Sequence, residues 1–129
     1  MKYKIDFSGP MLRPDGNPQK IFDANGIETN TDVELSDQFA AIMNTLEGLP
    51  ALKIWGWATE LAHGEILEMD ETDYLALKEA CGHAYAGEDA DGKKDPRRNR
   101  YGNFLVAQIQ ARFALADLNA AKVEPAEGS

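Results

Sequence analysis

The chain has 129 residues, of which 43% are hydrophobic, 22 are acidic and 13 are basic, so its formal net charge is −9. This size suits one domain with one core, and the acidic balance disfavours general attraction to nucleic acid or to an anionic membrane surface. No run approaches the roughly 18 consecutive apolar residues of a membrane span, and the amino terminus lacks the apolar region of a secretory signal. The one cysteine, Cys81, excludes an internal disulfide. We therefore expect a single cytoplasmic domain over residues 1–121, with no membrane partner.

The first 35 residues predict a small antiparallel sheet. Residues 2–7 alternate between apolar and charged side chains, which is the period-2 pattern of a half-buried strand. After a turn at 13–18, a short apolar piece at 20–22 leads to Asn25-Gly26, the favoured pair for a type I′ hairpin turn. A last short strand is expected at 33–35. Because isolated hairpins are marginally stable, this sheet of two or three strands needs helices to cover it.

Four helices are expected to follow the sheet. The first begins after an N-cap at Ser36, or earlier if Thr31 forms a capping box, and runs to about Glu47. Residues 66–69 form an extended link, and Asp70 then caps the third helix. The apolar face of this third helix contains Tyr74, Leu77, Cys81, Ala84 and Tyr85. The fold class is therefore α+β, mainly helical, with about four helices packed on a small amino-terminal sheet.

The second helix, Pro50–Gly64, carries both tryptophans and the cleanest amphipathic pattern in the chain. Its apolar stripe contains Leu61, Ile54 and Trp55, which indicates a core-facing side. Trp57 lies at the margin of this stripe. Its indole either shields the core or anchors a protein partner.

The fourth helix begins at Pro96 or only at Tyr101, and is expected to end near Ala121 before a disordered tail over 122–129. It has two apolar arcs on opposite sides. One arc contains Phe104, Ala107, Ala111, Ala114, Leu115 and Leu118, and the other contains Leu105, Val106, Ile109, Phe113 and Ala116. Either this is a central helix buried on both sides, or the second arc, with Val106, Ile109 and Phe113, is an interface with another protein or subunit.

Basic charge is concentrated between residues 93 and 100. Five basic residues and Asp95 give this window a charge of +4, which leaves −13 for the rest of the chain. Forked arginine donors suit phosphate groups, so the window is the best candidate for anion or nucleic-acid contact. The alternative is a solvated, salt-bridged helix start, and the acidic remainder would repel a polyanion. The candidate residues are Lys93, Lys94, Arg97, Arg98 and Arg100.

No motif predicts a catalytic, metal or cofactor site. Cys81 and His83 could be taken for a metal pair, but residues two apart on a helix project about 160° from each other. The acidic segment 88–92 resembles the start of a calcium loop, yet the glutamate that an EF-hand requires six residues after its glycine is Arg98 here. No phosphate-binding glycine loop or nucleophile elbow occurs. We expect no metal, no cofactor and no enzymatic activity.

Three pieces of the chain resemble short proteins encoded by tailed bacteriophages and prophages. They are Lys53-Ile54-Trp55 with Leu61-Ala62, Met69 to Tyr74 with Leu77-Lys78, and Gly102 with Gln108. The resemblance covers roughly residues 20–118. It implies a viral accessory or assembly protein that binds other proteins, and it assigns no functional residue.

The leading interpretation is therefore a non-enzymatic interaction protein, acting in virion assembly or against a host system. Its partner would be another protein or a second copy of the chain. The alternative is a nucleic-acid or small-anion binder that uses residues 93–100.

Overall fold

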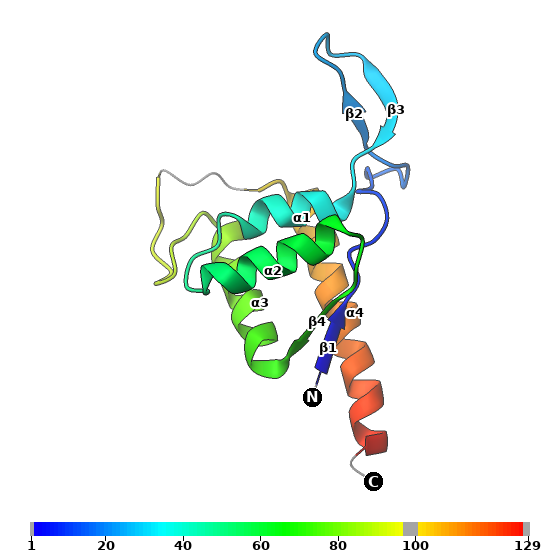
Figure 1. Cartoon of the computed structure of the whole chain (residues 1–129). Coiled ribbons are helices and arrows are strands. Elements are labelled where there is room, and N and C mark those ends of the chain that lie inside the picture. Colours follow the sequence, from blue (N-terminus) through cyan, green and yellow to red (C-terminus); the bar gives the residue numbers. More distant parts are fainter. Residues whose placement is uncertain (1, 97–100, 128–129) are drawn as a thin grey trace.

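The computed structural model describes residues 2–96 and 101–127, with side chains as far as residue 120. Its order is β1 (Lys2–Ile5), β2 (Lys20–Phe22), β3 (Glu28–Asp32), α1 (Leu35–Met43), α2 (Ala51–Ala62), β4 (Leu67–Asp70), α3 (Glu71–Tyr85) and α4 (Asn103–Glu127). The predicted α+β class, with four helices, is confirmed for this part of the chain. Figure 1 shows α1 and α2 in front of the body and α4 behind it.

The strands form two separate antiparallel pairs and not one amino-terminal sheet. Strand β1 pairs with β4 in a register that places Ile5 opposite Leu67. Residues 66–69 were expected to be an extended link, and most of them belong to strand β4, in which Leu67 and Met69 are buried and Glu68 and Asp70 are exposed. Strand β1 also contacts α4, so the β1–β4 ribbon joins the first strand of the chain to its last helix.

Strands β2 and β3 form a hairpin that projects away from the helices (Figure 1). The turn lies where Asn25-Gly26 predicted it, but it is not the type I′ turn, which needs a positive φ at both residues. Gly26 has a φ of +76°, whereas Asn25, like every non-glycine residue that the structure describes, does not have a positive φ. Instead, the Asp23 carboxylate accepts hydrogen bonds from the backbone N–H groups of Asn25 and Ile27. The expected strand at 33–35 is also wrong, since helix α1 already begins at Leu35.

Helices α1 and α2 pack on each other, and each differs from the sequence prediction: α1 in where it starts and ends, and α2 in which tryptophan is buried. Helix α1 starts after Glu34, which makes no side-chain cap, so neither Ser36 nor the Thr31 capping box defines its start, and it ends at Met43. In α2 the predicted roles of the tryptophans are exchanged. Trp57 is in the core with 8% of its surface exposed, whereas Trp55 is 73% exposed.

Helix α3 follows the prediction closely. The Asp70 carboxylate accepts a hydrogen bond of 2.9 Å from the backbone N–H of Asp73 and so caps the first turn. Tyr74, Leu77, Cys81 and Ala84 are buried, as expected for its apolar face.

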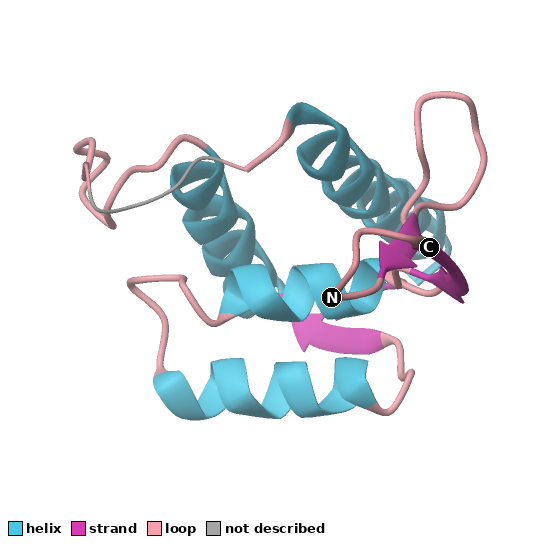
Figure 2. Cartoon of the chain, turned by 90° about the horizontal axis from the view of Figure 1, so that it is seen from above, coloured by secondary structure: helices cyan, strands magenta, loops and turns pink. Residues whose placement is uncertain are grey.

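Helix α4 begins at Asn103, later than either predicted start, and continues to Glu127. The backbone is therefore helical over 122–127, where a disordered tail was expected. Residues 128 and 129 of that tail lie outside the described residues. Figure 2 shows α4 and α2 on opposite sides of the body.

Aromatic rings join the two sides of the molecule. The ring of Phe7 stacks on Phe39 with centroids 4.1 Å apart, and the ring of Phe113 from α4 meets both of them edge-on at 5.9 Å. Tyr74 stacks on Tyr3 at 3.9 Å and lies 5.8 Å from the Phe113 ring. Stacked and edge-on ring pairs stabilise a fold beyond the burial of their apolar area, so this aromatic cluster fixes which side of α4 faces inward.

Candidate functional site

One of the two apolar arcs of α4 is mostly buried, and the other is exposed. The arc proposed as an interface is the buried one: Ile109 is 0% exposed, Phe113 is 4% exposed, and Val106 is partly buried beside them. Trp57, the other proposed interface residue, is in the same core. The interface prediction is therefore wrong for Trp57, Ile109 and Phe113, whose side chains pack in the core of the same chain. Val106 is only partly buried and is not one of these core residues, so its predicted role stays a prediction.

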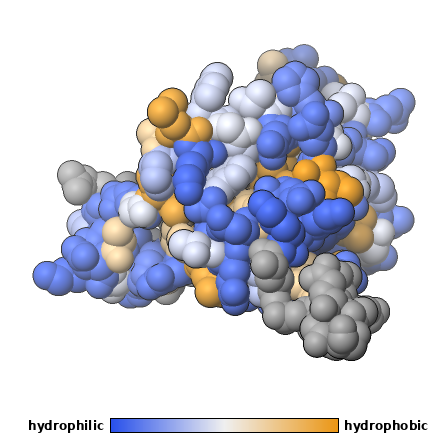
Figure 3. Space-filling model, turned by 60° about the horizontal axis from the view of Figure 1, so that its bottom comes forward, coloured by the Kyte–Doolittle hydropathy of each residue, from blue (hydrophilic) through white to orange (hydrophobic). Residues whose placement is uncertain are grey.

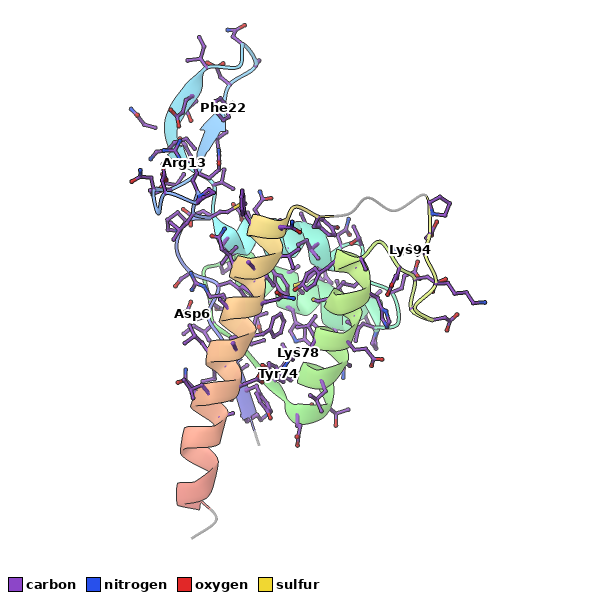
Figure 4. All side chains as sticks on the ribbon, turned by 180° about the vertical axis from the view of Figure 1, so that it is seen from behind. Asp6, Arg13, Phe22, Tyr74, Lys78 and Lys94 are labelled. Atoms are coloured by element: carbon purple, nitrogen blue, oxygen red, sulfur yellow. The ribbon has the colours of Figure 1, made fainter. Side chains whose placement is uncertain are left out.

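Polar contacts on both flanks hold α4 in this orientation. The Arg112 guanidinium donates to the backbone oxygen of Asp6 at 3.0 Å, and the Gln108 amide exchanges two hydrogen bonds with the backbone of Leu12. On the opposite flank, the Tyr74 hydroxyl lies 2.6 Å from an Asp117 carboxylate oxygen, whose other oxygen accepts from Lys78 at 3.0 Å. Figure 4 shows Tyr74 and Lys78 lying between α3 and α4, and Asp6 beside α4. Rotation of α4 would break contacts on both sides at once.

These contacts also set the ionisation of Asp117. Partial burial raises the pKa of its carboxyl, but the hydrogen bonds from Tyr74 and Lys78 more than offset that effect and leave the pKa below its usual value. For Tyr74, burial is the main cause of a raised pKa and the neighbouring Asp117 adds to it, so the phenol stays a protonated donor. The pair acts as a clamp between α3 and α4.

The second apolar arc of α4 faces outward. We call Phe104, Ala107, Ala111, Ala114, Leu115 and Leu118 the outer face of α4, since all six are exposed. Phe104, Leu115 and Leu118 have 62%, 54% and 51% of their surface accessible. At about 100° per residue the six fall within an arc of about 100°. Seen from behind, α4 lies in front of the body with no other ribbon over it (Figure 4).

A groove borders the outer face on the α3 side. It has a volume of about 320 Å³, and Ala114 belongs both to its wall and to the outer face. Cys81, Tyr85 and Phe113 also line it. The Tyr85 hydroxyl is buried without a hydrogen-bond partner among the described residues.

A second exposed apolar surface lies on α2. Leu52 is 86% exposed and Trp55 is 73% exposed, and they are one helical turn apart. Trp55 was expected in the core, but the inward side of α2 is set by Trp57 and Leu61, which leaves Leu52 pointing directly away from it. Hydrophobic residues therefore reach the surface in several places. Figure 3 shows hydrophobic patches, separated by hydrophilic residues, on the face that points downward in Figure 1.

The projecting hairpin adds a third apolar region. Ile21, Phe22 and Ile27 are each about half exposed or more. Lys20 and Asp32 form an ion pair near the base of the hairpin, and Phe22 lies out along it (Figure 4).

The basic window is only partly described. Lys93 and Lys94 are exposed on a turn that also carries Glu88 and Asp89, and the backbone N–H of Asp89 donates to the Lys93 oxygen at 2.8 Å. Arg97, Arg98 and Arg100 lie outside the described residues. Helix α4 begins at Asn103 and not at Pro96, and anion binding by the basic window stays a prediction.

Cys81 and His83 point apart, as helix geometry predicted. Cys81 is in the core, where burial raises the pKa of its thiol to about 12, so it is neither an activated nucleophile nor a ready metal ligand. His83 lies near the turn and its Nδ1 is 3.1 Å from a Glu88 oxygen. Within residues 2–96 and 101–127, no group of three or more histidine, cysteine, aspartate or glutamate side chains is placed to hold a metal ion.

Two further observations concern the chain as a whole. In its described part, no helix is both long enough and apolar enough to cross a membrane. Comparisons with protein-family models, with curated proteins and with solved structures found no match. Function must therefore be inferred from the surfaces of the molecule.

Proposed function

We propose that this protein works by binding other proteins and not as an enzyme. The observation that carries the proposal is the outer face of α4, where Phe104, Leu115 and Leu118 are all more than half exposed along one helix. Contiguous apolar surface of this kind is characteristic of interaction sites. An amphipathic surface helix normally turns such a stripe toward its own core, but here the core is filled by the opposite arc.

The α2 surface supports the same function. Exposed tryptophan is a residue type that is enriched among the energetically dominant positions of protein interfaces, and Trp55 has Leu52 beside it. Because α2 and α4 lie on opposite sides (Figure 2), the protein could contact two neighbours at once. That arrangement suits an assembly or adaptor protein.

The setting we propose is viral. The resemblance to short proteins of tailed bacteriophages favours a role in virion assembly or in interference with a host system. An acidic protein with apolar contact surfaces fits either setting.

Site-specific photocrosslinking tests the proposal. The photoreactive residue benzoylphenylalanine would replace Ala111 on α4, Trp55 on α2, or Glu79 as a control, whose side chain is 79% exposed on α3. Each full-length variant would be produced in the cells in which the protein acts. We expect discrete protein adducts at position 111, position 55 or both, and none of comparable yield at position 79.

A second substitution separates specific contact from random collision. Leu115→Asp should remove the adducts at position 111 without affecting those at position 55, because it places a charge in the middle of the outer face only. Adducts of equal yield at all three positions would contradict the proposal, and so would no adduct at either 55 or 111.

A further inference from the structure

We infer that the outer face of α4 binds a second copy of this chain, with the two α4 helices antiparallel and Ala111 at the two-fold axis. This inference rests on the proposed function and names the occupant of its main surface. It follows from the order of large and small residues along the outer face.

In an antiparallel pair with its two-fold axis at Ala111, a residue n positions after Ala111 in one copy faces the residue n positions before Ala111 in the other copy. Phe104 then meets Leu118 of the second copy, seven residues from the axis in each direction. Ala107 meets Leu115, four residues from the axis, so a large side chain faces a small one. Ala111 meets itself, where a small side chain allows close approach of the helices. The sixth residue of the outer face, Ala114, meets Gln108 at its edge, and the Gln108 amide is already bonded to the Leu12 backbone of its own chain. Five of the six outer-face residues thus pair with outer-face residues of the second copy, as an isologous interface requires.

The outer face of α4 contains no charged residue, which matters for a contact between two copies of an acidic chain. Two copies that carry −9 each repel one another, so a self-contact must avoid facing like charges. Between Phe104 and Leu118 the only charged residues are Arg112 and Asp117, and both are bound within their own chain on the flanks of the helix. The contact therefore brings no charge against its own copy, and its centre lacks the charges that interface cores avoid.

The size of the surface sets the expected strength. Fourteen residue steps from Phe104 to Leu118 span about 21 Å of helix, and a helix with side chains is about 10 Å wide. Two such strips bury less than the roughly 1,200–2,000 Å² of a standard stable interface. The dimer is therefore weak and depends on concentration, and added salt should strengthen it by screening the repulsion between the copies.

Three matched alanine-to-cysteine substitutions test the geometry. In the antiparallel pair the two copies of position 111 are adjacent, whereas those of position 114 are about 9 Å apart along the axis and those of position 107 about 12 Å apart. A disulfide needs Cα atoms closer than about 7 Å. Under mild oxidation, Ala111→Cys should therefore form a covalent dimer at least about tenfold faster than Ala107→Cys or Ala114→Cys. The native Cys81 is buried and should not compete.

The other outcomes overturn the inference. Parallel packing would crosslink all three variants at similar rates, and random collision would crosslink them no faster than a Glu79→Cys control on α3. If Ala111→Cys fails to crosslink while the photoreactive residue at position 111 captures a different protein, the self-contact is wrong and the proposed protein-binding function stands. If neither experiment yields a product at position 111 and none forms at position 55, both proposals fail.

Discussion

A pair of truncations on α4 would show which of its faces holds the fold together. Ile109 and Leu115 are both aliphatic, lie six residues apart, and have 0% and 54% of their surface exposed. Truncating a fully buried isoleucine to alanine costs about 2–5 kcal/mol, because the lost apolar contacts leave a cavity. The same truncation at a half-exposed position costs less than about 0.5 kcal/mol, and alanine is the better helix former.

Urea titration at low protein concentration gives both values without a contribution from self-association. In a separate thermal unfolding experiment on a chain of this length, we expect Ile109→Ala to lower the melting temperature by roughly 8–20 °C and Leu115→Ala by no more than about 2 °C. The m-values should stay equal if both variants unfold in one step. A loss at Leu115 as large as that at Ile109 would refute the assignment of inner and outer faces, and with it the proposed contact surface.

Other side chains give independent checks. Tyr74→Phe should lower the free energy of unfolding by about 1 kcal/mol in urea titration, since it removes a hydrogen bond to the charged Asp117 carboxylate, which is itself 46% exposed. This loss should be smaller in an Asp117→Asn background, and an unchanged loss would show that Tyr74 and Asp117 are not coupled. Because the pKa of Asp117 is lowered in the folded protein, its contribution is complete above about pH 4, the unfolded value, and is lost as the pH falls through the folded one. Between pH 5 and pH 3 the Asp117→Asn variant should therefore lose less stability than the parent, and an identical pH profile would contradict this. Asp70→Ala should lower the free energy of unfolding by about 1 kcal/mol because it removes the cap of α3, whereas Asp70→Asn should lower it much less because asparagine can also cap. Equal losses in the two variants would assign the effect to the β1–β4 strand pair instead.

Local chemistry made several elements predictable from the sequence. Asp70 and the periodic apolar residues after it determine α3, and Asn25-Gly26 located the hairpin turn. The turn type could not be read from that pair, because the Asp23 carboxylate bonds to the loop backbone and favours a different turn. The β1–β4 pair was missed for another reason: it joins residues more than 60 positions apart, and Leu67 to Asp70 show only a short alternation.

The candidate surfaces were the harder part to predict. Periodicity identified two apolar arcs on α4, but it did not say which arc the core would take. One signal was present: Ile109 and Phe113 belong to the arc with fewer alanines, which has more apolar surface to bury. Trp55 and Trp57 exchanged places for a related reason: Trp57 lay at the margin of the apolar stripe predicted for α2, and tertiary packing turned that margin toward the core.

The most direct test of the contact surface is sedimentation of the parent protein and of Leu115→Asp, each from about 10 μM to about 1 mM, the range in which a small interface dissociates. The average mass of the parent should rise from 14.2 kDa toward twice that value, and more steeply with added salt. The Leu115→Asp variant should stay at the mass of one chain while keeping its far-ultraviolet circular dichroism. A parent protein that stays at 14.2 kDa throughout, or a variant that associates equally well, would contradict the assignment of the outer face of α4 as a site of self-association.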